Sequence, residues 1–217
     1  MIILSTHGSS GLSGWNVSSV VQKIILRANK SLMLVRAYQL PDEDLEKMHY
    51  RRIFVGMDAS ARAELVLPVA VRLAQHYNAS ITLGTVVKKP ELLSRLPLSE
   101  EDGVMVERVA ERNKKAAAHY LEQVKAQIAS TGVDVDIRLA VSTNTLSTLH
   151  SMVEDEKADL VMLVAHGRSA DGRWPYGSVT TSFIAYGSTS LFIMQDLDDN
   201  EIQQTMAEQA MLKAQGH

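Results

Sequence analysis

Two stretches of this chain repeat each other at a constant separation of 159 residues. The matched pairs include His7/His166, Gly8/Gly167, Trp15/Trp174, Ser31/Ser190 and Leu32/Leu191. Such self-similarity is typical of two copies of one structural unit. The first copy matches only the later part of the second, because residues 53–159 have no counterpart before Met1. We therefore expect one complete unit preceded by a partial copy.

The second copy alternates strand-like and helix-like segments. Apolar runs predict strands at residues 53–57, 80–87, 133–141, 160–164 and 191–194. Helical spacing of apolar residues predicts helices at 62–77, 104–130, 145–156 and 179–186. In the first helix, the spacing places Leu65, Val69, Leu73 and Tyr77 on the buried face. Strands that alternate with helices imply right-handed crossovers, so we expect an α/β fold with a doubly wound, five-stranded parallel sheet.

The partial copy predicts a strand at 2–5, a helix at 19–28 and a strand at 32–35. We expect four parts along the chain: the partial unit at 1–38, a polar linker at 39–50, the complete domain at 51–196 and an acidic, weakly helical tail at 197–217. In parallel sheets of this kind, ligands bind beyond the carboxyl ends of the strands. Asp58, Val86 and the loop that begins at Ala165 all follow or end predicted strands, so we expect the site there.

Composition excludes several classes of function. The chain has 217 residues, a formal net charge of −3 and no cysteine. It therefore lacks the basic footprint of a nucleic-acid-binding protein, disulfides, cysteine-bound zinc and thiol catalysis. No apolar run approaches the roughly 18 residues of a membrane span, and the first residues do not form a signal peptide. We expect a cytoplasmic protein.

A glycine-rich loop follows the predicted strand at 160–164. Gly167 comes soon after the strand, and Gly177-Ser178 opens the next helix. Glycines let backbone N–H groups approach a phosphate, and a helix N-terminus adds positive potential. Arg168 and Ser169 could add a charged donor and a hydroxyl donor. The loop is not a Walker motif, since the chain has no Gly-Lys-Ser/Thr, and no Gly-x-Gly-x-x-Gly follows the first strand of the unit.

At these residues the chain resembles the universal stress protein family, whose nucleotide-binding members carry Gly-x2-Gly-x9-Gly-Ser/Thr. Val164, Gly167, Gly177 and Ser178 stand at the four signature positions, so three of the four match. The strand that ends in Met57-Asp58-Ala-Ser60 is similar to the family's first strand, and the order of elements agrees. The resemblance implies the adenine nucleotide alpha-hydrolase-like, Rossmann-like fold.

The resemblance also implies a function and its residues. In ATP-binding members, an Asp after the first strand and the backbone after the second strand hold the adenosine, and the glycine loop holds the phosphates. These positions are Asp58, Val86, Gly167, Gly177 and Ser178 here. The implied ligand is ATP, with Mg²⁺. Val164 departs from the signature, because a β-branched residue stands where the first glycine should be. Two readings stay open: a nucleotide-responsive stress protein, and an interaction protein that has lost the site.

Catalysis is not expected. The signatures of nucleotidyl transferases and ATP pyrophosphatases are absent, and slow ATP hydrolysis would need a general base that the sequence does not reveal. We interpret His7 and His166 as residues that fix the loop backbone, because no carboxylate partner is near them in the sequence. Asp196, Asp198 and Asp199 read as a solvated acidic tail rather than a metal site.

Assembly follows from the same resemblance. Family members commonly pair through the last strand of each unit, which makes 32–35 and 191–194 the natural partners. The strand at 2–5 then lacks a neighbour, and an unpaired apolar strand promotes association. We expect a homodimer through last-strand pairing. An upstream start, a natural truncation with a homodimer, and a fragment all remain explanations of the partial copy.

Overall fold

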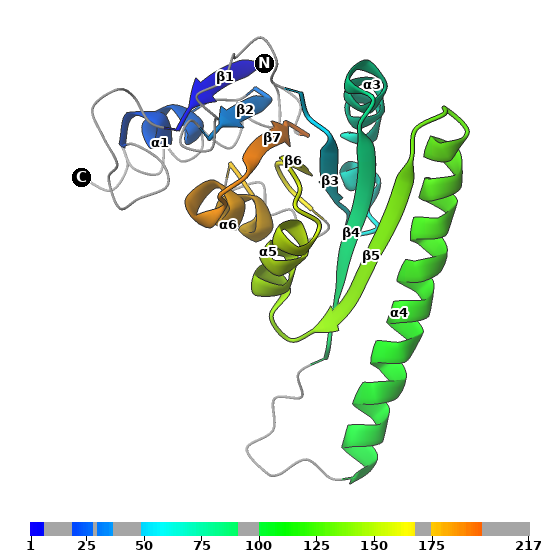
Figure 1. Cartoon of the computed structure of the whole chain (residues 1–217). Coiled ribbons are helices and arrows are strands. Elements are labelled where there is room, and N and C mark those ends of the chain that lie inside the picture. The colour runs from blue at the N-terminus through cyan, green and yellow to red at the C-terminus, as the bar shows by residue number, and fades with distance from the viewer. Residues whose placement is uncertain (7–18, 28–29, 37–48, 91–99, 168–174, 197–217) are drawn as a thin grey trace, which may run out of the picture. The chain divides into compact units, whose positions relative to one another are not determined.

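The computed structural model describes residues 1–6, 19–27, 30–36, 49–90, 100–167 and 175–196 (Figure 1). Its strands are β1 (Ile2–Ser5), β2 (Leu32–Val35), β3 (Arg52–Gly56), β4 (Ser80–Lys88), β5 (Val135–Ser142), β6 (Leu160–Val164) and β7 (Ser190–Met194). Its helices are α1 (Ser19–Ile25), α2 (Ala61–Glu64), α3 (Leu67–Tyr77), α4 (Glu100–Ala129), α5 (Thr145–Asp155) and α6 (Ser178–Tyr186). The order of strands and helices agrees with the sequence prediction, except that α2 and α3 stand in place of one predicted helix.

The strands form a mixed, mostly parallel sheet in the order β1-β2-β7-β6-β3-β4-β5. The prediction of an α/β fold is confirmed, and β1 and β2 of the N-terminal segment extend the sheet from the five strands expected for the second copy to seven. It is mixed because β2 pairs with β7 in the antiparallel direction, with Met33 opposite Phe192. The predicted partnership of these two strands is therefore confirmed. The segment 133–141 alternates apolar residues with Asp134, Asp136 and Arg138, which is typical of a half-exposed edge strand, and β5 is the last strand of the order.

The chain divides into two compact units, each with its own set of strands. The first consists of Met1–Leu45, Ser60–Val66 and Met162–His217. In it, β1 runs parallel to β2, and Ile2 pairs with Leu32. The core of this unit includes leucine and isoleucine side chains that are at most 1% exposed: Leu32, Leu34, Leu191 and Ile193. The core of the first unit therefore lies along the antiparallel pair of β2 and β7.

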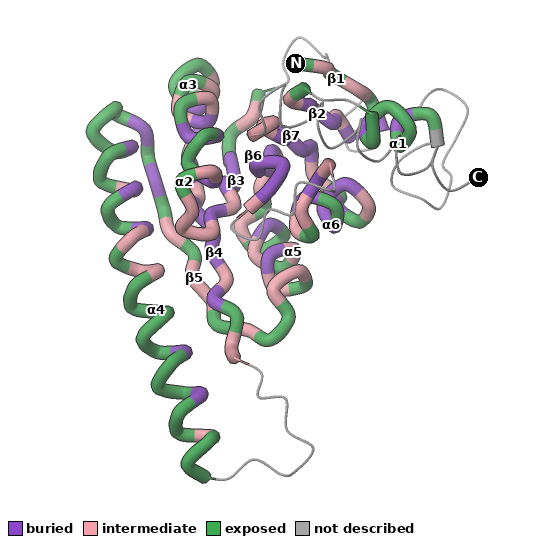
Figure 2. The backbone as a smooth tube through the Cα atoms, turned by 180° about the vertical axis from the view of Figure 1, so that it is seen from behind, coloured by how far each residue is buried: buried purple, intermediate pink, exposed green. Residues whose placement is uncertain are grey.

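The second unit consists of Glu46–Ala59 and Leu67–Val161. Its strands β3, β4 and β5 are parallel neighbours, with Gly56 opposite Gly84 and Val86 opposite Ala140. The helices α3, α4 and α5 each pack on two of these strands. Figure 2 shows that β3 and β4 are largely buried, whereas β5 is mostly half-buried or exposed and α4 exposes most of its length. None of the described helices, the 30-residue α4 included, is long and apolar enough to cross a membrane.

The single helix predicted at 62–77 is wrong, because the chain forms α2 and α3 in its place. Pro68 lies at the second position of α3. Proline has no N–H, and its ring disfavours a helical residue before it, so it fits a first turn but not a helix interior. The break also changes the buried face. Leu65 is 46% exposed, and the buried residues are Ala63 in α2 and Leu67, Ala70 and Ala74 in α3.

Candidate functional site

The glycine-rich loop joins the end of β6 to the start of α6 in the first unit. Gly177 is the N-cap of α6, and its N–H donates to the carbonyl oxygen of Ala165 at 2.8 Å. The hydroxyl of Thr180, in the first turn of α6, donates to the carbonyl oxygen of Val164 at 2.7 Å. These two bonds bring the entrance and the exit of the loop together. The N-terminus of α6 therefore lies beside the end of β6, as an anion-binding loop requires.

Val164 does not need the backbone freedom of a glycine. It is the last residue of β6, and it is not among the described non-glycine residues with a positive φ, which are Ala59, Asn78 and Lys157. Only 7% of Val164 is exposed, so its side chain belongs to the core and offers little surface to a ligand. The departure of this residue from the family signature therefore leaves the local backbone regular.

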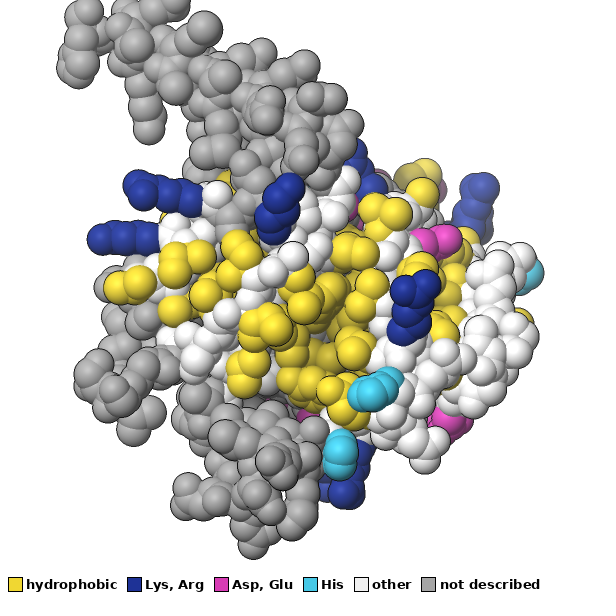
Figure 3. Space-filling model, turned by 90° about the horizontal axis from the view of Figure 1, so that it is seen from above, with side chains coloured by type: hydrophobic (Ala, Val, Ile, Leu, Met, Phe, Trp, Pro, Cys, Tyr) yellow, Lys and Arg dark blue, Asp and Glu magenta, His cyan; other side chains and the backbone are white. Residues whose placement is uncertain are grey.

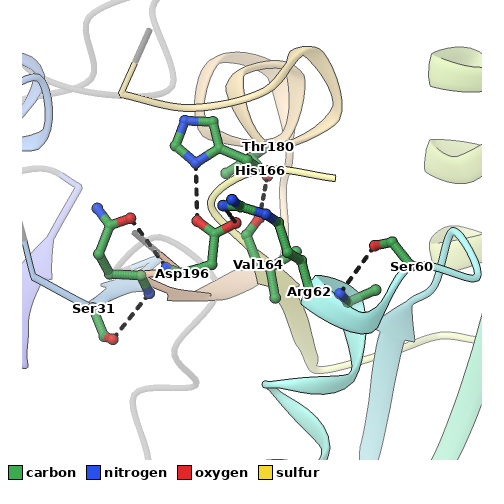
Figure 4. Close-up of polar contacts among 9 residues, drawn as sticks. Ser31, Ser60, Arg62, Val164, His166, Thr180 and Asp196 are labelled. Carbon is green, nitrogen blue, oxygen red and sulfur yellow. Dashed lines mark hydrogen bonds and ion pairs between the residues drawn. The ribbon is translucent and has the colours of Figure 1, made fainter. Parts of the chain in front are cut away.

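A buried carboxylate lies beside the loop. The side chain of Asp196, two residues after β7, is 0% exposed, and its two oxygens have different partners. Its Oδ1 lies 2.9 Å from His166 Nδ1, and its Oδ2 lies 3.2 Å from Arg62 Nη1 (Figure 4). A carboxylate only accepts hydrogen bonds, so the Nδ1 atom of His166 carries the proton. Three segments of the first unit, at α2, β6 and β7, meet at this one side chain.

This cluster corrects two sequence interpretations. Asp196 is not part of a solvated tail, because it is buried and paired. His166 does have a carboxylate partner, which lies 30 residues farther along the chain. The ends of β6 and β7 lie together, since the N–H of Ala165 donates to the carbonyl oxygen of Met194 at 2.8 Å. Comparing the polar residues that directly follow the two strands could have found the pair. Asp198, Asp199 and His7 lie outside the described residues.

The other predicted site residues fall into two groups. Gly167, Gly177 and Ser178 are in the first unit, where Ser178 is exposed at the start of α6. Asp58 and Val86 are in the second unit, half-buried at the carboxyl ends of β3 and β4. Arg168, Ser169 and Trp174 lie outside the described residues.

Asp58 and Val86 lie at one end of their two strands, because each is two residues beyond the pair Gly56–Gly84. The side chain of Ser60 accepts a hydrogen bond from the N–H of Ala63 at 3.2 Å, so Ser60 is the N-cap of α2. Within the described part of the chain, His, Asp and Glu side chains form no group of three that could hold a metal ion.

A mostly parallel sheet, with helices between its strands and a glycine turn that opens a helix beyond β6, places the chain in the α/β class. The family model of the universal stress protein family matches residues 49–194. The chain belongs to the universal stress protein family.

Individual relatives agree with this assignment. A Staphylococcus aureus (strain USA300) protein named for the family is 26% identical over 147 residues, which cover 67% of this chain and 84% of the relative. Among solved structures, universal stress protein UspA from Lactobacillus plantarum is similar with a TM-score of 0.60 at 18% identity, over 68% of this chain and 99% of that one. A universal stress protein solved in complex with cAMP is similar with a TM-score of 0.51 at 18% identity, over 69% of this chain and 100% of that one. At such identities the structural likeness shows the fold alone.

Proposed function

We propose that this protein is a non-catalytic, cytoplasmic stress-response protein that binds an adenine nucleotide. The proposed ligand is ATP together with Mg²⁺. The carrying observation is the glycine turn, in which Gly177 caps α6 directly beside the end of β6. A helix N-terminus with backbone N–H groups and positive potential favours phosphate. The similarity to a family member solved with cAMP supports an adenine nucleotide as the ligand.

In this proposal Gly167, Gly177 and Ser178 hold the phosphates, and Arg168 is an additional donor. Asp58 and the backbone at Val86 are the residues that the family resemblance assigns to the adenosine. The regular backbone and burial of Val164 support the proposal, because they remove the objection that this residue distorts the loop.

The test is the substitution Gly177→Val, with ATP binding measured by isothermal titration. A Cβ atom at Gly177 would lie 3.6 Å from the Ala165 oxygen and 3.8 Å from the Gly167 nitrogen, which are ordinary contacts. We therefore expect the fold to persist while the branched side chain fills the space that a phosphate needs. Binding should become undetectable, and thermal unfolding should show a folded variant.

Gly103→Val is the matched control. A Cβ atom at Gly103, in α4, would have no neighbour within 4 Å, so this variant should bind ATP as the unchanged protein does. Unchanged affinity of the Gly177 variant would contradict the assignment of the loop.

The alternative function is an interaction protein of the same family that binds no nucleotide. One observation favours it: large apolar side chains are exposed near the N-terminus, with Met1 at 72%, Ile3 at 62% and Val20 at 64%. Figure 3 views the molecule from the end at which Figure 1 has the N-terminus, and hydrophobic side chains gather in the middle of this view. Such surfaces are typical of protein contacts. Absence of ATP binding in the unchanged protein would favour this alternative.

We also propose that residues 1–38 are a partial copy of the family unit, paired with the complete one. Two reciprocal hydrogen bonds support this. The N–H of Arg36 donates to the Ser190 hydroxyl oxygen at 3.4 Å, and that of Gln195 donates to the Ser31 hydroxyl oxygen at 3.1 Å. Arg36 corresponds to Gln195, and Ser31 corresponds to Ser190. Both pairs have the separation of 159 residues that the sequence repeat shows. Such reciprocity is expected of two related units around a two-fold axis.

A further inference from the structure

We propose that Arg62 is a phosphate-contacting residue of the nucleotide site, and that Asp196 and His166 position it beside the glycine loop. This inference rests on the proposed nucleotide binding and adds a charged ligand that the glycine motif does not contain. Its observations all lie in the first unit.

The cluster of Arg62, His166 and Asp196 lies beside the glycine loop. His166 directly precedes Gly167, and the Cβ position of Gly177 is only 3.7 Å from the Cα of His166. His166, whose imidazole contacts Asp196, therefore lies where the two ends of the loop meet. Arg62 is bound to the other oxygen of the same carboxylate, at 3.2 Å. One carboxylate thus links the guanidinium of Arg62 to the residue at which the loop begins (Figure 4).

The carboxylate of Asp196 and the guanidinium of Arg62 carry opposite charges. A buried, ionised Asp196 next to an anion-binding loop would repel phosphate, and in a medium of low dielectric this repulsion is strong. The ion pair with Arg62 offsets this repulsion, so that the cluster as a whole does not repel a phosphate. Arg62 is also the only accessible member of the cluster: its side chain is 37% exposed, while those of Asp196 and His166 are 0% and 1% exposed. The cluster therefore presents its cationic end to solvent.

The guanidinium of Arg62 is suited to bind a phosphate. Arginine carries five N–H donors in a planar fork, so a bond from Nη1 to Asp196 is compatible with a second, anionic ligand. Pairing with a buried carboxylate also restricts the side chain, so that less rotamer entropy is lost when a phosphate binds. Arg62 has the geometry of a pre-oriented counter-charge, and Asp196 and His166 are positioning residues.

The test compares ATP with AMP, because a counter-charge acts more strongly on the ligand with more phosphates. In isothermal titrations of the full chain with Mg²⁺ present, Arg62→Gln should weaken ATP binding about tenfold, as expected for one charged hydrogen bond. AMP binding should weaken about threefold or less. Arg62→Lys keeps the positive charge but lacks the planar guanidinium, so its affinity for ATP should lie between those of the unchanged protein and of Arg62→Gln. Arg72→Gln, at an exposed position of α3, is the matched control and should change neither affinity.

The outcomes separate this inference from the proposed function. Equal losses for ATP and AMP would mean that Arg62 only supports the loop, and unchanged ATP affinity would mean that it does not meet the phosphates. Either result overturns the inference while nucleotide binding stands. If the unchanged protein binds neither ATP nor AMP, the proposed function fails and the inference fails with it.

Discussion

Ala59 adopts a left-handed backbone conformation, with φ of 58°, between β3 and α2. In this conformation the Cβ atom of an L-residue is crowded, at a cost of about 1 kcal/mol or more, and glycine avoids that cost. We predict that Ala59→Gly raises the free energy of unfolding by about 1 kcal/mol. Denaturant unfolding of the two proteins measures the difference.

Ala116→Gly is the control for this substitution, because it makes the same chemical change at an exposed position inside α4. It should lower the free energy of unfolding by about 1 kcal/mol. If both variants were destabilised, the left-handed conformation of Ala59 would not be the cause of strain.

Tyr176 is a buried tyrosine whose hydroxyl donates to the carbonyl oxygen of Ile25, the last residue of α1, at 2.9 Å. Burial raises the pKa of Tyr176 from 10.0 to about 12. An unfolded chain loses this proton near pH 10, so the contribution of Tyr176 to stability is complete below that pH and is lost as the pH rises to about 12.

We predict that a tyrosinate absorbance titration contains a late step near pH 12, and that Tyr176→Phe removes it. The variant should also be less stable by about 1 kcal/mol at neutral pH, because it leaves a buried carbonyl without its donor. Tyr186→Phe, at a position that is 72% exposed, should leave the late step in place. Persistence of the step in the Tyr176 variant would contradict the assignment.

Among single residues, the sequence predicted the place of the loop glycines but not the contacts between the charged side chains. Gly177 and Ser178 could be placed at the start of a helix because a local motif encodes them. The partnership of His166 with Asp196 depends on two strands that meet in the sheet, which no local pattern shows. Arg62 gave no signal either, because its role follows only from that buried carboxylate.

At the scale of elements, Arg36 closes the C-terminal end of α6. Its guanidinium Nη2 donates to the carbonyl oxygens of Phe183 at 2.9 Å and Ile184 at 3.1 Å, and only 1% of the residue is exposed. A cation at this end of a helix satisfies free carbonyl groups and complements the helix dipole. The strand β2 is thereby tied to α6 through the residue that follows it.

We predict that Arg36→Met lowers the free energy of unfolding by about 3 kcal/mol, because it removes the charged hydrogen bonds that the buried guanidinium donates to the carbonyl oxygens of Phe183 and Ile184. Arg27→Met is the control at an exposed position and should change stability by less than about 0.5 kcal/mol. Chemical denaturation of both variants measures the two effects. Equal stability of the Arg36 variant and the unchanged protein would show that the cap does not stabilise the fold.

Most elements could be predicted because their apolar patterns are strong. β1, β2 and β6 match their predicted bounds, and the edge position of β5 follows from its alternating pattern. The error at 62–77 arose from treating a proline as compatible with the interior of a helix. The buried face of that segment was misjudged for the same reason, since Leu65 leaves the core when the helix breaks.

For the whole molecule, a homodimer stays a prediction, but β1 replaces the last strand as the place where we expect the pairing. In the sheet order β7 stands between β2 and β6, whereas β1 is the first strand and has one described neighbour, β2. The edge of β1, with Ile3 exposed at 62%, is therefore where we expect a second copy to pair.

Light scattering should find a dimer, and Ile3→Lys should shift it toward the monomer, because a lysine on an edge strand discourages pairing. The exposed position of Ile3 means that the variant should still fold. A monomer at all concentrations of the unchanged protein would contradict self-association.

Titration of the full chain with ATP and Mg²⁺ decides whether the glycine turn of this universal stress protein binds an adenine nucleotide. We expect micromolar binding of one nucleotide per chain. An absence of heat at millimolar ATP, confirmed by equilibrium dialysis, would contradict nucleotide binding and would assign the protein to the interaction class.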